Sequence, residues 1–255
     1  VEEEIELVTH CEPSLSAQVL LGVERELDKP IEELLGRRAR DRKSESTRRS
    51  AMELIHPEVT SQALGILRSW DHLQGNVIPL LALVIYVYAT EIQNANWNGI
   101  AAALALYAVH WLVEIANAVI QHLSGHALWT VPDHTSFLIL IGVGIEISLM
   151  FSIAGLIASK HLPRDPKQTI LGMNGRWVVI AGFAALFSIL EIPLEKSPHF
   201  AWVYPWWGAL PVFATVYLPF FAAAVFAYDA PRERQKRFIG GLFALDAALL
   251  VLFGP

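Results

Sequence analysis

The chain has 255 residues, of which 54% are hydrophobic and only 17% are charged, and its mean hydropathy is +0.41. This composition is more apolar than the roughly 45–50% that is usual for soluble domains, so it favours a membrane protein. A net charge of −6 and the lack of a basic stripe exclude a nucleic-acid-binding surface, and the single cysteine, Cys11, excludes an intrachain disulfide and a cysteine zinc cluster.

Residues 1–75 form a polar N-terminal segment that differs from the apolar remainder, 76–255. The segment holds ten of the nineteen Lys and Arg residues. Apolar residues at helical spacing from Ser14 to Leu35 predict a surface helix packed on the membrane domain. The basic, serine-bearing stretch 37–49 is a linker that is either solvated or in contact with anionic headgroups, and a second short helix is expected from His56 to Leu73.

Six apolar segments follow, and each is close to the ~20 residues that an α-helix needs to cross a bilayer. They are continuous apolar runs without strand-like alternation, which argues against a membrane barrel. The sequence therefore predicts an all-α, polytopic membrane helix bundle with about six transmembrane helices. The expected spans are 77–92, 99–121, 135–158, 177–194, 206–228 and 238–253.

The charges of the connecting loops predict an orientation for this multi-pass protein. The loops 160–176 and 232–237 carry four Lys or Arg residues each, whereas 122–134 and 195–205 together carry one. The positive-inside rule then places 122–134 and 195–205 outside the cytoplasm. The number of crossings predicts, independently of that rule, that these two loops share one face of the membrane.

Acidic residues lie inside the predicted spans, among them Glu114, Glu146, Glu191 and Asp246. A carboxylate at bilayer depth costs about 2.5–3.5 kcal/mol on insertion scales, so such residues usually line a functional site. Glu191 is close to the end of its span, where a solvated carboxylate at the interface is an equally good interpretation. Asp246 is isolated, and the sequence gives it no role.

The second span carries a polar stripe. His110, Glu114, Asn117 and Gln121 follow one another at spacings of four, three and four, so they share one helical face. One interpretation is a seam in which polar side chains hold helices together. The other is a substrate, ion or proton site, which explains better why both a His and a Glu are present.

We therefore predict a catalytic set of His110, Glu114 and Glu146, which would meet inside the bundle. Asn117 and Gln121 would bind the substrate. Burial raises the pKa of a carboxyl group towards the range that is useful for proton transfer.

The loop after the second span contains His122, His126, Asp133 and His134. Imidazole and carboxylate are common ligands of transition metals, so these residues are candidate ligands for Fe, Cu or Zn. His122 and His126 would form an i, i+4 pair if the helix continued. Neither an HxxHH box nor an HExxH motif is present, and a proton relay or a plain interfacial loop remains an alternative.

A second loop is rich in aromatic residues: Trp202, Tyr204, Trp206 and Trp207. An aromatic belt at the headgroup level would explain them. Alternatively, they form the mouth of a site for a lipid or isoprenoid substrate. Pro205, Pro211 and Pro219 predict a broken or kinked fifth helix, which can open a cavity.

The order His110-x-x-x-Glu114 on one span, Glu146 on the next and an aromatic stretch later resembles the arrangement in the emopamil-binding-protein family of sterol isomerases. This resemblance implies that Glu114 and Glu146 shuttle a proton and that a tryptophan such as Trp206 stabilises a carbocation. It covers only a few residues, and the six spans and the long N-terminal segment depart from that family.

Three functions fit these observations. The first is an integral membrane enzyme that acts on a lipid-soluble substrate through a buried His/Glu site, with or without a metal. The second is a proton-coupled transporter that uses the same residues. The third is a non-catalytic subunit that contacts a partner membrane protein. Membrane lipid is an expected partner in each case, and nucleic acid is not.

Overall fold

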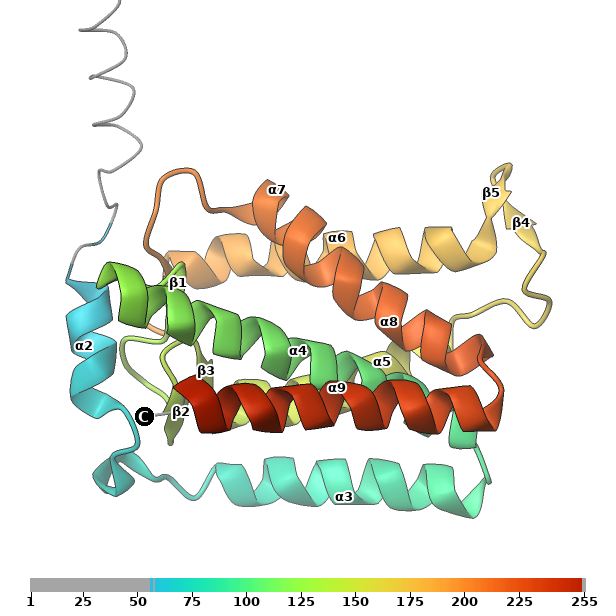
Figure 1. Cartoon of the computed structure of the whole chain (residues 1–255), viewed down its shortest axis with the longest axis horizontal. Helices are drawn as coiled ribbons and strands as arrows, with labels where there is room; N and C mark the ends of the chain where they lie inside the picture. Colours follow the sequence, from blue (N-terminus) through green and yellow to red (C-terminus); the bar gives the residue numbers. More distant parts are fainter. Residues whose placement is uncertain (1–55, 57, 254–255) are drawn as a thin grey trace, which may run out of the picture. The chain divides into compact units, whose positions relative to one another are not determined.

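The computed structural model describes residues 56 and 58–253 of the chain (Figure 1). The chain divides into two units, residues 1–52 and 53–255, and all of the described residues belong to the second. The helix predicted from Ser14 to Leu35 and the linker predicted at 37–49 lie outside the described residues.

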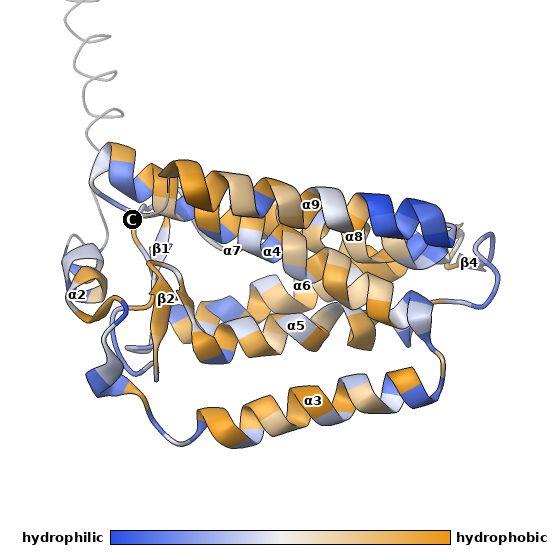
Figure 2. Ribbon diagram, turned by 60° about the horizontal axis from the view of Figure 1, so that its bottom comes forward, coloured by the Kyte–Doolittle hydropathy of each residue, from blue (hydrophilic) through white to orange (hydrophobic). Residues whose placement is uncertain are grey.

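The described residues are mostly helical, and they contain three helices that are long and apolar enough to cross a membrane. These are α4 (Trp97–Ser124), α6 (Gly175–Glu195) and the continuous helix Ala209–Asp229, which consists of α7 (Ala209–Val212), the π-helical segment η2 (Phe213–Tyr217) and α8 (Leu218–Asp229). Two shorter helices, α3 (Val77–Gln93) and α5 (Ile145–Ser159), are also apolar. The last helix, α9 (Arg232–Phe253), begins with charged turns and becomes apolar afterwards (Figure 2).

These six helices run alternately in opposite directions, and α4 packs against α5, α8 and α9 (Figure 1). The helical bundle expected from the apolar runs is confirmed, but the span predicted at 135–158 is wrong in its first part. Residues 138–144 instead form a small antiparallel hairpin of β2 (Leu138–Leu140) and β3 (Val143–Gly144), and helix α5 starts only at Ile145. Hydropathy depends on the sequence alone, so it cannot distinguish an apolar hairpin from the first turns of an apolar helix.

Small elements gather at the two ends of the bundle. At one end, β1 (Trp129–Thr130) pairs with β6 (Ala201–Trp202), so the loops 122–134 and 195–205 lie together, as the number of crossings predicted. The same end holds α2 (Val59–Ile66) and the 3₁₀ turn η1 (Trp70–His72), and Ala63 of α2 packs on the residues around β1 and β2. At the other end, β4 (Thr169–Ile170) and β5 (Met173–Asn174) form a hairpin before α6.

The boundaries of α4 follow from its capping residues. The Asn96 side chain accepts a hydrogen bond from Gly99 N at 3.1 Å and so caps the N-terminus. Gly125 ends the helix with φ +82°, a left-handed conformation that favours glycine. Because the helix stops at Ser124, His126 does not lie one helical turn above His122, and the predicted i, i+4 histidine pair does not form.

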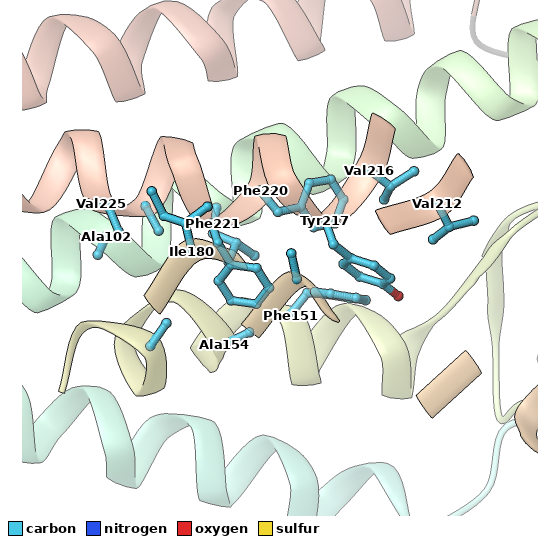
Figure 3. Packing of buried hydrophobic residues seen from close by; sticks show 14 of the residues in the cluster. Ala102, Phe151, Ala154, Ile180, Val212, Val216, Tyr217, Phe220, Phe221 and Val225 are labelled. Atoms are coloured by element: carbon cyan, nitrogen blue, oxygen red, sulfur yellow. The ribbon is translucent and has the colours of Figure 1, made fainter. Parts of the chain in front are cut away.

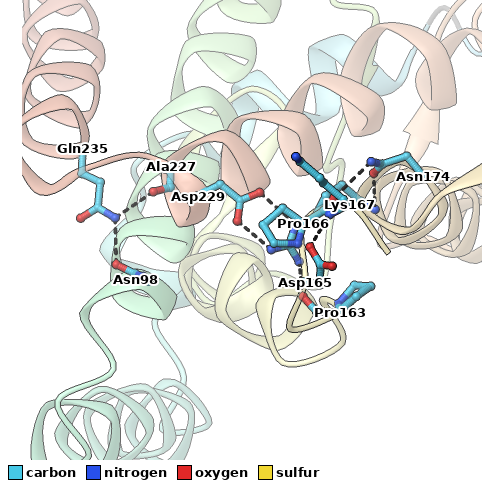
Figure 4. Close-up of polar contacts among 10 residues, drawn as sticks. Asn98, Pro163, Asp165, Pro166, Lys167, Asn174, Ala227, Asp229 and Gln235 are labelled. Carbon is cyan, nitrogen blue, oxygen red and sulfur yellow. Dashed lines mark hydrogen bonds and ion pairs between the residues drawn. The ribbon is translucent and has the colours of Figure 1, made fainter. Parts of the chain in front are cut away.

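A polar network joins the helices at the end that carries β4 and β5 (Figure 4). The guanidinium of Arg176 donates two hydrogen bonds to the carboxylate of Asp229, at 2.9 and 2.7 Å, and one to the carbonyl of Pro163 at 2.7 Å. The amide of Gln235 donates to Asn98 Oδ1 and to the carbonyl of Ala227. This network fixes α6, α8, α9 and α4 relative to one another.

Candidate functional site

A cavity lies between α4, α5, α6 and the α7–η2–α8 helix, near the end of the bundle that carries β1 and β6. The space in which the centre of a water molecule can lie is about 80 Å³, whereas one water needs ~10–15 Å³. A mostly apolar cavity with a few convergent polar groups is the usual form of a small-molecule site. The described polar residues that line it are His110, Glu114, Trp129, Glu191 and Tyr217, and the apolar ones include Ile147, Met150, Phe151, Phe200, Val212, Val216 and Phe220.

His110 and Glu114 come from α4 and are almost completely buried, with exposed fractions of 1% and 5%. Among the residues that the structure describes, neither His110 Nε2 nor Glu114 Oε2 has a hydrogen-bond partner. A buried polar atom without a partner costs about 1–3 kcal/mol, so the fold retains two groups that a bound molecule could satisfy. The ring of His110 stacks on Phe151 at 4.4 Å between centroids, which fixes its direction.

Glu191 brings a second carboxylate to the cavity. It accepts a hydrogen bond from the hydroxyl of Tyr217 at 2.5 Å and one from Trp202 Nε1 at 3.1 Å. These two donors hold each of its oxygens in place, whereas Glu114 Oε2 has no hydrogen-bond partner among the described residues. The prediction that Glu191 is equally well a solvated interfacial group is not supported by these contacts.

The π-helical segment η2 explains how Tyr217 reaches the cavity. The N–H of Leu218 donates to the carbonyl of Phe213, five residues earlier, and Pro219 has no N–H with which to continue an α-helical ladder. Tyr217 lies next to Phe151 of α5, and Val216 and Phe220 of the same helix as Tyr217 also line the cavity (Figure 3). The prolines predicted a broken or kinked fifth helix; the structure has a continuous helix with a π-helical segment just before Pro219.

The polar stripe of α4 serves two different purposes. Asn117 does not line the cavity, because its side chain donates to the carbonyl of Trp129 at 2.9 Å and accepts from the N–H of Leu128 at 2.8 Å. It thereby holds the segment before β1 against α4 and positions Trp129. Gln121, one turn later, lines a separate groove with residues of α2, β2 and the end of α9.

Gly142 lies where the cavity is most crowded. A Cβ atom added to it would be 2.6 Å from Asn117 Nδ2 and 2.7 Å from Glu114 Oε2. Only glycine permits this close approach of the turn between β2 and β3 to α4. The wall of the cavity beside Glu114 therefore depends on a residue without a side chain.

Glu146 does not join His110 and Glu114 in the cavity. It lies in the first turn of α5, where its carboxylate accepts hydrogen bonds from Ser136 N and Thr135 Oγ1, both at 2.7 Å. These contacts tie the loop before β2 to the start of α5. Glu191, and not the predicted Glu146, is the second carboxylate that lines the cavity with Glu114.

The candidate metal ligands are spread over the end of the bundle. His122 lines the groove that holds Gln121, and His126 follows the left-handed Gly125. Asp133 and His134 are exposed, and the ring of His134 lies 5.1 Å from that of His199. In the part of the chain that the structure describes, no three His, Cys, Asp or Glu side chains are close enough together to hold a metal ion. The geometry therefore gives the predicted metal site no support.

The aromatic loop contributes to the site through only some of its members. Trp202 donates to Glu191, and Trp207 stacks on Trp129 at 5.7 Å between centroids with the rings nearly parallel. Tyr204 packs against Trp206, which is half exposed. Trp202 and Trp207 thus support the wall of the cavity, and Trp206 faces outwards.

Of the described residues that line the cavity, only His110 and Glu114 were predicted site residues; the others include Trp129, Glu191, Phe200 and Tyr217. The sequence could have indicated Glu191, because it is an acidic residue within a predicted span and lies shortly before Pro193. Tyr217 carried a weaker signal, two residues before Pro219. Trp129 and Phe200 are ordinary aromatic loop residues, and only the pairing of β1 with β6 brings them to the cavity.

The fold and the site together define a helical membrane protein with a buried acidic cavity. Residues 57–255 match an uncharacterized membrane protein family, and the chain belongs to this family. A protein of Archaeoglobus fulgidus, described as an uncharacterized protein, is 41% identical over 201 residues, which cover 77% of this chain and 95% of the relative. No solved structure matches the chain.

Proposed function

We propose that the protein is an integral membrane enzyme that performs proton transfer on a lipid-soluble substrate bound in the cavity. One observation carries this proposal: an imidazole and a carboxylate of α4 and a carboxylate of α6 line one largely apolar space, and two of their polar atoms lack partners within the described residues. An apolar wall favours a lipid-soluble molecule, and the unpartnered atoms are available to its reacting part.

The three groups suit different tasks. Glu114 has a free oxygen that can take a proton from a substrate or give one back. Glu191 is held by Tyr217 and Trp202, so it acts best as a fixed charge or as the acceptor in a second proton transfer. His110 has a free Nε2 and a direction that is fixed by Phe151, so it can hold or polarise the substrate.

Proton transfer can be tested without knowledge of the substrate. The purified protein is incubated in D₂O with lipids extracted from its native membrane, and the lipids are compared by mass spectrometry. We expect one lipid class to gain deuterium or to be converted with the wild-type protein and not with Glu114→Gln. Glu195→Gln, which removes a carboxylate from the same bundle without touching the cavity, should behave as the wild type. An identical lipid profile for the wild type and Glu114→Gln would contradict the proposal.

A further inference from the structure

We infer that the ligand of the cavity carries a positive charge, as a lipid-soluble amine does. This inference rests on the proposed ligand-binding function of the cavity and adds the class of ligand. It starts from the charges of the lining residues, which include Glu114 and Glu191 but, among the described residues, neither Lys nor Arg.

The two carboxylates differ in this respect from two other acidic groups of the described residues, whereas Asp246 of α9 is likewise buried without a partner. Asp229 is paired with Arg176, and Glu91 is in contact with Lys160. Both therefore have a cation supplied by the chain itself. In the cavity, the neighbours of Glu191 are the neutral donors Tyr217 and Trp202, and Glu114 Oε2 has no partner within the described residues.

A carboxyl group that is buried without a counter-ion favours its neutral form, and a cation of the ligand would stabilise the ionised form. The aromatic rings of Trp129, Phe151, Tyr217 and Phe220 line the same space. Aromatic faces attract cations within about 6 Å of the ring centre, so they favour the same charge as the carboxylates do. Much of the remaining wall is aliphatic and suits a hydrocarbon tail, whereas an anionic headgroup would find no Lys or Arg among the described lining residues.

The inference can be tested with three photoreactive probes that share one alkyl chain and differ in their end group: a primary amine, a hydroxyl and a carboxylate. The full-length protein is placed in phosphatidylcholine nanodiscs, whose lipids have no net charge. Labelled peptides are then quantified by mass spectrometry, with attention to Met150–Phe151 and Val212–Phe220. We expect the amine probe to label these peptides about tenfold more strongly than the hydroxyl probe, and the carboxylate probe to label them least.

Variants separate charge from shape. Glu114→Gln and Glu191→Gln keep the size of the side chain, and each should lower labelling by the amine about tenfold while labelling by the alcohol changes less than about twofold. Glu195→Gln, on the same helix as Glu191, should leave all three probes unchanged. Because two separate carboxylates are tested, the loss of one variant through misfolding leaves the other informative.

The outcomes distinguish the two proposals. Equal labelling by the amine and the alcohol in the wild type, or a loss of both in Glu114→Gln, would overturn the cationic ligand but leave a lipid-binding cavity. Failure of all three probes to label the cavity peptides would overturn the proposed function as well.

Discussion

At the scale of single residues, two kinds of buried polar group can be compared among the described residues. Those at the ends of the bundle, such as Arg176 and Asn117, use nearly every donor and acceptor within the chain. Those in the cavity, His110 and Glu114, leave atoms without a described partner. The first kind stabilises the fold, and the second kind is retained at a cost in stability, which is typical of functional groups.

Arg176→Ala should destabilise the protein, because it leaves the carboxylate of Asp229 without its two hydrogen bonds. Asp229 is about a third exposed, so solvent will compensate in part, and we expect a loss of about 2 kcal/mol. Thermal unfolding of the purified protein measures the effect. Arg237→Ala, which removes an exposed arginine, is the matched control, and equal melting temperatures for the two variants would refute the assignment.

Asn117→Ala should release the segment before β1, since the N–H of Leu128 and the carbonyl of Trp129 both lose their partner. Each unsatisfied buried group costs about 1–3 kcal/mol. We expect lower thermal stability and weaker photolabelling of the cavity, because Trp129 forms part of its wall. Gln121→Ala, four residues later on the same helix, should change neither measurement, and a comparable loss in that variant would show that Asn117 has no special function.

At the scale of elements, close packing of α4 against α5 depends on a small residue. A Cβ atom on Gly155 of α5 would lie 2.5 Å from the carbonyl oxygen of Ala102 and 2.9 Å from the Cα of Ala103. Small residues allow helix backbones to approach closely in membranes, where this contact replaces the hydrophobic effect as a source of stability. The same pair of helices carries His110 and Phe151 to the cavity.

Gly155→Ala should therefore separate α4 from α5 and lower the stability by about 1–3 kcal/mol. Gly182→Ala on α6 is the control, because a Cβ there meets nothing within 4 Å. The midpoint of thermal unfolding should be lower for Gly155→Ala than for Gly182→Ala. Unchanged stability in Gly155→Ala would mean that the two helices are not held at this distance.

The sequence was sufficient for the elements that depend on hydropathy and capping, and insufficient for those that depend on long-range pairing. The positions of α4 and α6 follow from apolar runs bounded by Asn96, Gly125 and Asn174. The hairpin at 138–144 was missed, because its residues are as apolar as a span. The same limit explains the site: His110 and Glu114 share a helix and could be grouped from their spacing, whereas Glu191 joins them only through the packing of α6 on the bundle.

At the scale of the whole molecule, the two ends of the bundle differ in charge. Within the described residues, the end with β4 and β5 carries most of the Lys and Arg residues of the loops, and the end with β1 and β6 carries Arg68 and Lys196. The positive-inside rule therefore predicts that the cavity opens nearer the extracytoplasmic face.

Cysteine accessibility tests this orientation. In a Cys11→Ser background, which removes the single cysteine of the chain, Ser197→Cys and His134→Cys should react with an impermeant maleimide from outside intact cells. Lys167→Cys should react only after the membrane is opened. Reaction of Ser197→Cys and Lys167→Cys from the same side would contradict the alternating arrangement of the helices.

The late start of α5 has a consequence for the surrounding lipid. Its 15 residues extend over roughly 22 Å, which is less than the ~30 Å thickness of the hydrocarbon layer. The β2–β3 hairpin continues from it and bonds its own backbone groups, so protein occupies a depth that acyl chains would otherwise fill. A short apolar helix is accommodated by local thinning of the bilayer, so the protein should partition into the thinner regions of a membrane of mixed thickness.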